Sequence, residues 1–400
     1  MNPSIIHNGG LKVAKQNSNS KQLRAQDVHQ LVRATLQEHF QLDMKNRDYT
    51  AQDIWEVLVA ASVERISIEM ACQLLKAAPS GTMVRTLVKE MLQDKGQMQE
   101  VERQVNDLLT ARLPRQLLKS KLPVAIDLTE LPYHGQQAAD DPFVRRGRAK
   151  SGTTHFYVFA TLYVVKKNRR YTLALVMMRQ TEKAQAVVER LLARGDQLRL
   201  RIKRLYLDRG FDNNGLVAYL KKQPFPTIIP LVIRGKQGGS RALLVGRKSY
   251  TTTYERRSTI YGQETLPLHI VCKYSKGKYK RKGVFRFAYI VIGRLKRQPA
   301  QIAEEYRRRF GIETSYRLMN TVRARTTCKI AAFRLFLVAL AFLLLNLWQY
   351  VKWTYLFVPK PGPRTILHHL LPLARWRLWL WEMIKQRLGF SLVIDIPLAV

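Results

Sequence analysis

The sequence predicts a mixed α/β core that is flanked by helical regions and interrupted by a β-rich insertion. Helical periodicity, with apolar residues every three or four positions, runs from residue 24 to about residue 120 and gives way to β-rich runs after residue 121. Through residue 234 these runs alternate with amphipathic helical segments, which is the order typical of an α/β sheet. The apolar run Leu335–Leu345 begins a further helical part. All-α regions are therefore expected on both sides of the core.

The length of 400 residues allows two or three domains. The expected divisions, which follow these changes of pattern, are a disordered polar tail at 1–23, a helical domain at 24–120, an α/β core at 121–234 and 301–350, a β-rich insertion at 235–300, and a C-terminal helical region at 351–400. The eleven apolar residues of Leu335–Leu345 are fewer than the roughly 20 that span a bilayer. We therefore expect a buried core helix and no membrane partner, with a membrane anchor as the alternative.

Residues 67–93 have the layout of a helix-turn-helix. Two short helical runs flank the turn residues Pro79 and Gly81. Ser67 can cap the first helix, and Ser80 or Thr82 can cap the second. This pattern indicates a unit whose second helix reads DNA. An ordinary turn inside a helical bundle is the alternative, because bundles contain the same signals.

The charge balance indicates a polyanionic partner. Lys and Arg total 68 against 29 Asp and Glu, a formal net charge of +39. This excess favours nucleic acid over a small-molecule substrate. The three cysteines are widely separated and form neither a disulfide framework nor a zinc pattern, which fits a reducing cytoplasm. The N-terminus lacks the apolar stretch of a signal peptide.

Two acids of the predicted core lie within or directly after apolar strands. Asp127 lies inside the run 124–131, and Asp208 follows the strand 202–207. The other expected elements are the basic loop around Arg145–Lys150, strands at 155–165 and 171–178, a helix at 182–194 that stops at Gly195, a helix at 214–221 and a strand at 227–233. Three antiparallel strands, helix, strand, helix, strand is a ribonuclease-H-like order, in which Asp208 lies where open α/β sheets bind ligands.

The insertion alternates strand-like runs with basic turns. The expected strands are 241–245, 249–254, 266–271 and 284–292. Between the last two, the segment 273–282 interleaves cations with tyrosines, which favours contact with DNA. We expect Lys278, Lys280 and Arg281 to bind the DNA backbone. A solvated hairpin tip is the alternative.

A charged stripe follows the insertion. Tyr306, Arg309, Glu313, Arg317 and Asn320 recur at steps of three or four, so they share one face of an α-helix. Arginine forks bind phosphate, which makes Glu313 a carboxylate set among phosphate-binding groups. Glu313 simply pairing with Arg309 or Arg317 is the alternative.

Gly311 lies inside this helical pattern. Glycine in a helix costs about 1 kcal/mol relative to alanine. The glycine therefore indicates a close approach to the backbone at this point.

Asp127, Asp208 and Glu313 can converge in the predicted layout. Three ionised carboxylates need cations between them, and oxygen ligands suit Mg²⁺ or Mn²⁺. Two such ions are the known arrangement for phosphodiester chemistry. Asp212 is a possible substitute for Asp208, while Glu130, Glu304 and Glu305 fit the pattern poorly. His134 and His155 are expected to be structural.

These motifs resemble the DDE transposases of the IS4 type over about 121–348. The resemblance rests on Asp127 in AIDLTEL, Asp208 in LYLDRGF and the spacing Tyr306-x-x-Arg309-x-x-x-Glu313. The run 306–327 resembles ISH3-like members in particular. That family has Lys seven residues after the glutamate, where this chain has Asn320, so Arg317 or Arg323 would supply the cation. Related enzymes with a hairpin DNA intermediate hold a flipped base with a tryptophan of the insertion, and this insertion has none.

The resemblance implies metal-dependent nicking and strand transfer on double-stranded DNA by a dimer, at element ends and target DNA. It also implies a cytoplasmic, nucleoid-associated protein of a prokaryote. A DNA-binding relative without catalysis and a metal-dependent nuclease are the alternatives.

Overall fold

The computed structural model describes residues 22–93, 98–135, 141–236, 238–276, 282–362 and 364–393. They divide into two compact units. Residues of the ranges 1–112 and 319–400 form the first, and residues of 113–318 form the second. The C-terminal helices therefore belong with the N-terminal ones, and the division falls at 318/319, whereas the sequence pattern led us to extend the core to residue 350.

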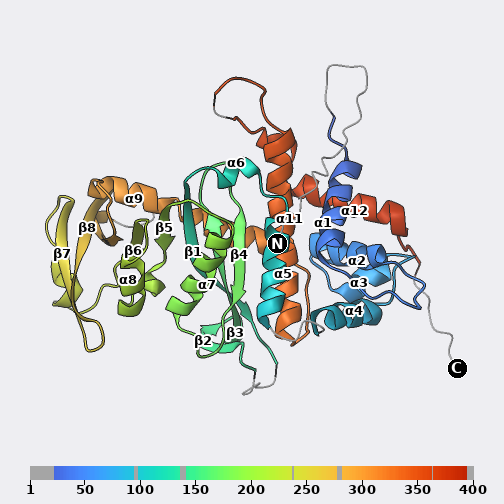
Figure 1. Cartoon of the computed structure of the whole chain (residues 1–400), viewed down its shortest axis with the longest axis horizontal. Coiled ribbons are helices and arrows are strands. Elements are labelled where there is room, and N and C mark those ends of the chain that lie inside the picture. Colours follow the sequence, from blue (N-terminus) through green and yellow to red (C-terminus); the bar gives the residue numbers. More distant parts are fainter. Residues whose placement is uncertain are drawn as a thin grey trace, which may run out of the picture. The chain divides into compact units, whose positions relative to one another are not determined.

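The first unit is all-helical (Figure 1). Its described helices are α1 (Ala25–His39), α2 (Ala51–Glu64), α3 (Ile68–Leu74), α4 (Gly81–Gln93), α5 (Met98–Thr110), α11 (Ala331–Tyr355) and α12 (Leu373–Leu388), with the short 3₁₀ turn η4 (His368–Leu370). The ring of Phe336 on α11 lies 5.4 Å from that of Phe40, and Asn346 donates to the Leu109 carbonyl at 2.9 Å. Segments more than 200 residues apart thus share one core.

Helix α11 is longer than its apolar run predicted. It has 25 residues and contains an 18-residue stretch with a mean hydropathy of 2.1, so among the described helices it alone is long and apolar enough to cross a membrane. However, 83% of this 18-residue stretch is buried inside the protein. Its apolar surface is covered by α5, α1, α2 and α4, as a core helix requires.

The two short helices predicted at 67–93 are present as α3 and α4. The Ser67 hydroxyl accepts a hydrogen bond from the Met70 N–H at 3.1 Å, and Ser80 accepts one from Met83 at 3.2 Å. Ser80, rather than Thr82, therefore caps the second helix. The two helices pack on each other, as the pattern predicted.

The second unit contains one mixed sheet of nine described strands. Its strands are β1 (Leu122–Pro132), β2 (Val144–Lys150), β3 (Thr153–Val164), β4 (Thr172–Met177), β5 (Ile202–Leu207), β6 (Thr227–Pro230), β7 (Tyr250–Ser258), β8 (Gly262–Lys276) and β9 (Lys282–Ile292). The order is β2-β3-β1-β5-β6-β9-β8-β7, with β4 also paired to β3. Strands β1, β5 and β6 are parallel, and the other pairs are antiparallel.

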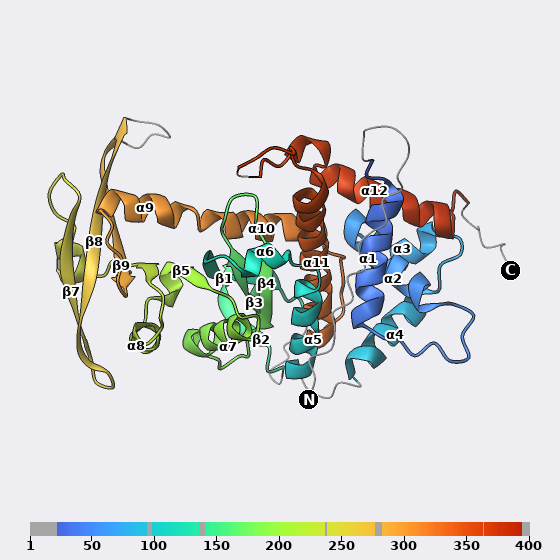
Figure 2. The same ribbon diagram turned by 45° about the horizontal axis from the view of Figure 1, so that its top comes forward.

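The insertion continues the core sheet. Strand β9 pairs with β6 in the register Thr227↔Ile292 to Pro230↔Tyr289, so β7, β8 and β9 extend the sheet beyond β6 (Figure 2). The remaining described elements of this unit are α6 (Arg115–Leu118), α7 (Ala184–Gln197), η1 (Arg209–Phe211), α8 (Asn214–Lys221), η2 (Gly239–Leu243), α9 (Pro299–Arg307) and most of α10 (Phe310–Thr321).

Three local predictions were wrong. The basic loop near Arg145 contains β2, an exposed edge strand whose charged side chains hide the usual alternation of apolar residues. The run 241–245 lies in η2 and its cap instead of a strand, because Ser240 accepts from the Arg234 N–H and donates to the Val232 carbonyl to close a turn. Helix α7 continues through Gly195, and the left-handed residue after the helix is Arg199, with φ of 51°.

The charged stripe lies on two helices instead of one. Helix α9 ends at Arg307, and α10 begins at Phe310. Between them the backbone makes i→i+3 bonds, with Arg309 N–H donating to the Tyr306 carbonyl at 2.9 Å and Ile312 N–H to the Arg309 carbonyl at 2.8 Å. This tighter turn rotates Arg309 inward, so that it is 5% exposed.

Candidate functional site

The three predicted acids converge on a single guanidinium group. Arg309 donates to Asp127 Oδ2 through Nη1 at 2.8 Å and to Glu313 Oε1 through Nη2 at 2.9 Å. The same Nη2 lies 3.3 Å from Asp208 Oδ1. Carboxylates that are 81 to 186 residues apart in sequence therefore surround one positive charge. The predicted convergence is present in the structure, with a cation of the protein itself between the acids.

The sheet places Asp127 and Asp208 side by side. Ile126 pairs with Leu207 on the parallel strands β1 and β5, and the two aspartates follow these residues. Asp127 faces inward with its side chain 13% exposed, while Asp208 lies just beyond β5 with its side chain 45% exposed. The carboxyl ends of parallel strands thus supply two of the three acids.

Asp127 is held by Leu128, Tyr316 and Arg309. Its Oδ1 accepts the Leu128 N–H at 2.9 Å, and Tyr316 on α10 donates to its backbone carbonyl at 2.7 Å. The Tyr316 hydroxyl also bonds Thr161 of β3 at 2.8 Å. Burial raises the pKa of Asp127, and the nearby Asp208 charge adds to this, while Arg309 and the Leu128 N–H oppose it. A carboxylate in this position needs a positive charge to remain ionised.

Glu313 lies in the first turn of α10, with its side chain 47% exposed. Of the three acids, Glu313 and Asp208 are open to solvent and Asp127 is enclosed. A phosphate group that approaches from solvent would meet the two exposed carboxylates first.

Tyr306 fixes the end of α9 on the sheet. Its hydroxyl donates to the Leu207 carbonyl at 3.0 Å, and its side chain is buried. Its ring packs against Tyr289 of β9, with centroids 5.2 Å apart, and the Arg309 guanidinium lies 5.6 Å from its centre. Because its hydroxyl is bonded to the Leu207 carbonyl, Tyr306 helps to position Asp208, which follows Leu207, and its ring helps to position Arg309.

A cavity of about 590 Å³ adjoins Asp208 and Arg309. The insertion contributes Lys273, Arg286 and Phe287 to its lining, and α10 contributes Phe310. Phe287 and Phe310 are 41% and 49% exposed, which is unusual for phenylalanine. Cations and open aromatic faces beside paired acids are suited to a DNA strand with an unstacked base.

The sequence pattern did not reveal these residues. In the sequence Phe287 looks like an ordinary strand residue. Its exposure follows from the register of β9 on β8, in which it lies opposite Val271. Tyr316 likewise reads as an apolar position of α10. The insertion lines the cavity with the exposed Phe287 and the buried Tyr289, and it contributes no tryptophan.

The other predicted DNA contacts differ in their placement. Arg317 is exposed on α10, where its Nη2 lies 3.4 Å from Thr314. Asn320 lies half-buried in the last turn of α10, Arg323 follows that helix, and both belong to the first compact unit. Burial, with Arg334 and Arg65 nearby, lowers the pKa of Arg323 to about 10. Lys278, Lys280 and Arg281 lie outside the described residues.

The alternative acids have structural partners. Asp212 is paired with Arg256 of β7 and accepts the Val232 N–H at 2.8 Å. Glu305 pairs with Arg204 and with Arg297. Glu130 is exposed and 4.0 Å from Lys150. These acids therefore stabilise the unit, and Asp208 is the acid that meets Asp127.

The acids fit a hard divalent cation by chemistry. Within the described ranges, no three His, Cys, Asp or Glu side chains lie close enough together to hold a metal ion as they stand. The donors of Asp127, Asp208 and Glu313 are all oxygen and already surround a positive charge, which is the environment Mg²⁺ or Mn²⁺ takes. Arg309 occupies the space between them.

The sequence matches a known protein family, and the fold is similar to that of a solved structure. A family model described as "Transposase DDE domain" matches residues 119–347, more than half of the chain and all three acids. No curated protein matches the sequence. The cryo-EM structure of a piggyBac transposase synaptic complex with hairpin DNA is similar, with a TM-score of 0.54 and 11% identity, over 92% of this chain and 80% of that one. At this identity the likeness shows a common fold, a mixed sheet with helices of the ribonuclease-H-like kind.

Proposed function

Because this chain belongs to the transposase DDE domain family, we propose that it is a DNA transposase that cuts and joins phosphodiester bonds at Asp127, Asp208 and Glu313. The observation that carries the proposal is the meeting of these three carboxylates around Arg309, beside a cavity lined by cations and exposed aromatic rings. Its relationship to ISH3-like members rests on the sequence of 306–327 alone.

The proposed chemistry has two steps at one site. A water oxygen attacks a phosphorus atom at the element end, the bond to the 3′ oxygen breaks, and a 3′-hydroxyl is left. That hydroxyl then attacks a phosphorus of target DNA, and the displaced 3′ oxygen takes up a proton. Two Mg²⁺ or Mn²⁺ ions, when bound, would supply Lewis acidity to the attacking and leaving oxygens. No covalent bond between protein and DNA is needed.

The chain's own residues would have separate roles as metal ligands, phosphate-binding groups and base-stacking rings. Asp127, fixed by Leu128 and Tyr316, would be the rigid ligand, and Asp208 and Glu313 the two open ones. If these acids held a metal, the Arg309 fork would be free to bind a phosphate. Lys273 and Arg286 would hold the neighbouring backbone, and Phe287 and Phe310 would stack on a base. Arg317, Asn320 and Arg323, with Lys278, Lys280 and Arg281, remain further candidates for DNA contact.

We also propose the wider setting from the family. The protein would act as a dimer on two element ends, with α3 and α4 as the DNA-reading pair, in the nucleoid of a prokaryotic cytoplasm. These statements rest on the family and on the +39 charge.

A cleavage and strand-transfer assay tests the proposal. The substrate is duplex DNA carrying the gene's flanking ends, with Mg²⁺ or EDTA, and the proteins are wild type, Glu313→Gln and the control Glu304→Gln. We expect metal-dependent nicks at the ends, joined products with wild type, and a loss of roughly 100-fold or more for Glu313→Gln, because a removed ligand costs at least what its supporting residues cost. Glu304 is exposed, and among the described residues its ion pair is with Arg307, so its variant should cut normally.

Other outcomes would select the alternatives. Nicks without joined products would indicate a nuclease. Binding to the ends without cleavage in any metal would indicate a DNA-binding relative in which Arg309 neutralises the acids permanently.

A further inference from the structure

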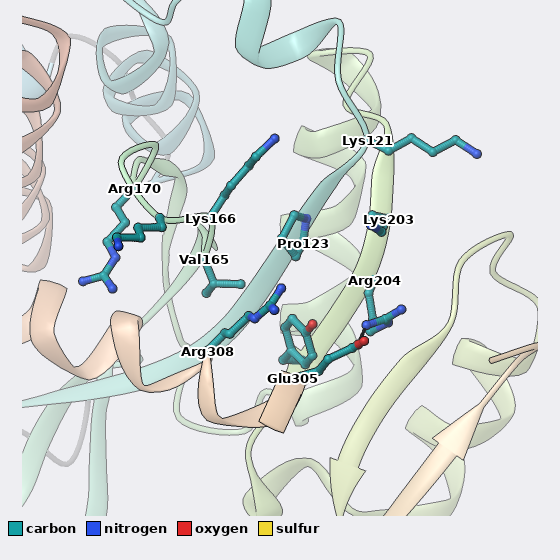
Figure 3. Close-up of a pocket in the computed structure, with 11 residues that line it drawn as sticks. Lys121, Pro123, Val165, Lys166, Arg170, Lys203, Arg204, Glu305 and Arg308 are labelled. Atoms are coloured by element: carbon teal, nitrogen blue, oxygen red, sulfur yellow. Dashed lines mark ion pairs between the residues drawn. The ribbon is translucent and has the colours of Figure 1, made fainter. Parts of the chain in front are cut away.

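A second cavity of about 600 Å³ lies within the catalytic unit, away from the three acids. Figure 3 shows its side chains, which come from the start of β1, the β3–β4 hairpin, β5 and the end of α9. Pro123 and Val165 give it an apolar lining, and most of the remaining residues are cationic. None of these residues belongs to the site around Arg309.

The positive charge of this cavity is not balanced. Its seven cations are Lys121, Lys166, Lys167, Arg170, Lys203, Arg204 and Arg308, and its one acid is Glu305. Glu305 is already used, because it pairs with Arg204 in the cavity and with Arg297 outside it. For the six other cations no ion pair is found in the part of the chain that the structure describes.

The cations crowd one another. Burial, followed by the charges of Arg169 and Lys203, lowers the pKa of Lys166 from its ordinary value. Like charges gathered in a concavity repel each other, and an anion in the concavity would relieve that repulsion. Lys121, Lys167, Lys203 and Arg308 are exposed, so their charged groups can reach a ligand in solvent.

We propose that this cavity binds backbone phosphates of DNA, as a contact separate from the catalytic acids. The identity of the polyanion rests on the proposed function. Lysines act as point charges for phosphate, and the cavity offers few groups that could read a base or a sugar, which favours backbone over nucleotide binding.

The position of the cavity separates it from the cleavage site. Lys203 and Asp208 are five residues apart along β5, which corresponds to about 16 Å at the rise of a strand. A single phosphate cannot reach both. A phosphate held at Lys203 would therefore be a different one from a phosphate at the acids, on the same strand or on another duplex.

Duplex binding as a function of salt tests the proposal. Fluorescence anisotropy with a 30-base-pair duplex is measured from 0.05 to 0.3 M salt in EDTA for wild type, Lys166→Ala/Lys203→Ala and Lys183→Ala/Lys222→Ala. The control lysines are exposed residues of the same unit that do not line the cavity. Circular dichroism and thermal melting confirm that both double variants are folded.

We expect the cavity variant to weaken duplex binding about 10-fold at 0.1 M salt. The slope of log Kd against log salt should fall by about two, since each lost phosphate contact removes roughly 0.9. The control variant should change both quantities by less than half as much. Equal effects of the two variants would overturn the proposal, because the cavity lysines would then act only through net charge.

A second arm separates DNA from small phosphate compounds. Calorimetry with tripolyphosphate should show no binding tighter than millimolar. Tight binding of tripolyphosphate that the cavity variant abolishes, together with unchanged duplex affinity, would also overturn the proposal. Cleavage is not read in either arm, so a failure of the proposed catalytic activity would leave the result for this cavity unaffected.

Discussion

At the scale of single residues, Arg309 has the most consequential position in the chain. Its side chain is 6% exposed and touches three carboxylates, and one of them, Asp127, is itself 13% exposed. Removing one partner of a buried ion pair costs about 3–5 kcal/mol, because the other charge is left without compensation. Arg309 therefore stabilises the site when no metal is bound.

We predict that Arg309→Met lowers the free energy of unfolding by about 2–4 kcal/mol in EDTA, somewhat less than the cost of a fully buried pair because two of the acids reach solvent. Mn²⁺ should restore more stability to this variant than it adds to wild type, since the metal no longer competes with the guanidinium. Denaturant unfolding with and without Mn²⁺ measures both effects.

Arg307→Met is the matched control. Arg307 is largely exposed and pairs with Glu304 at 3.4 Å, so its loss should change stability by no more than about 0.5 kcal/mol. The assignment of Arg309 as counter-ion fails if the two variants lose the same stability, or if Mn²⁺ affects Arg309→Met and wild type alike.

At the scale of elements, the glycines at the starts of α4 and α10 differ in how much room they leave for a side chain. A Cβ on Gly311 would lie 3.6 Å from the Arg170 guanidinium, which is ordinary contact. A Cβ on Gly81 would lie 3.0 Å from the Cα of Glu69 and would clash with its carboxylate. The close approach expected at Gly311 is therefore absent among the described residues, whereas α3 and α4 approach each other closely at Gly81.

We predict that Gly311→Ala leaves stability unchanged or raises it by up to about 1 kcal/mol, because alanine favours the helix. Gly81→Ala should destabilise the protein by about 1–3 kcal/mol, since Glu69 must move. Thermal melting of the two variants distinguishes them. Equal melting temperatures would mean that α3 and α4 can separate without cost.

The elements also show what the sequence could predict. Asp127, Asp208, the strands at these two acids and the cap Ser67 follow from local patterns, since each depends on neighbours in the chain. For the second helix the sequence left Ser80 and Thr82 open, and the structure shows Ser80. Strand β2 and the turn at Arg309 do not, because β2 is defined by its pairing with β3 and the turn by ion pairs to residues up to 182 positions away. The exposure of the cavity residue Phe287 could not be predicted either, because it depends on the pairing of β9 with β8.

At the scale of the whole molecule, the two ends of the chain build one unit. Trp55 and Phe40 pack on Phe336, and Asp53 is 2.5 Å from Arg387. This could not be seen in the sequence, because helical periodicity shows that a helix has an apolar face without showing which helix covers it. The apolar run 335–345 is explained by this burial.

We predict that residues 22–112 do not fold alone, although their pattern resembles a self-contained DNA-binding domain. Without α11 and α12 the fragment would expose Trp55 and Phe40, and the Leu109 carbonyl would lose the Asn346 amide. Thermal circular dichroism of the fragment should show no cooperative transition, and its amide NMR spectrum should be poorly dispersed. Co-expression with residues 319–393 should restore both. A cooperative transition and a dispersed spectrum for 22–112 by itself would mean that the C-terminal helices only cover a domain that is already stable, and the boundary inferred from the sequence would then be the correct one.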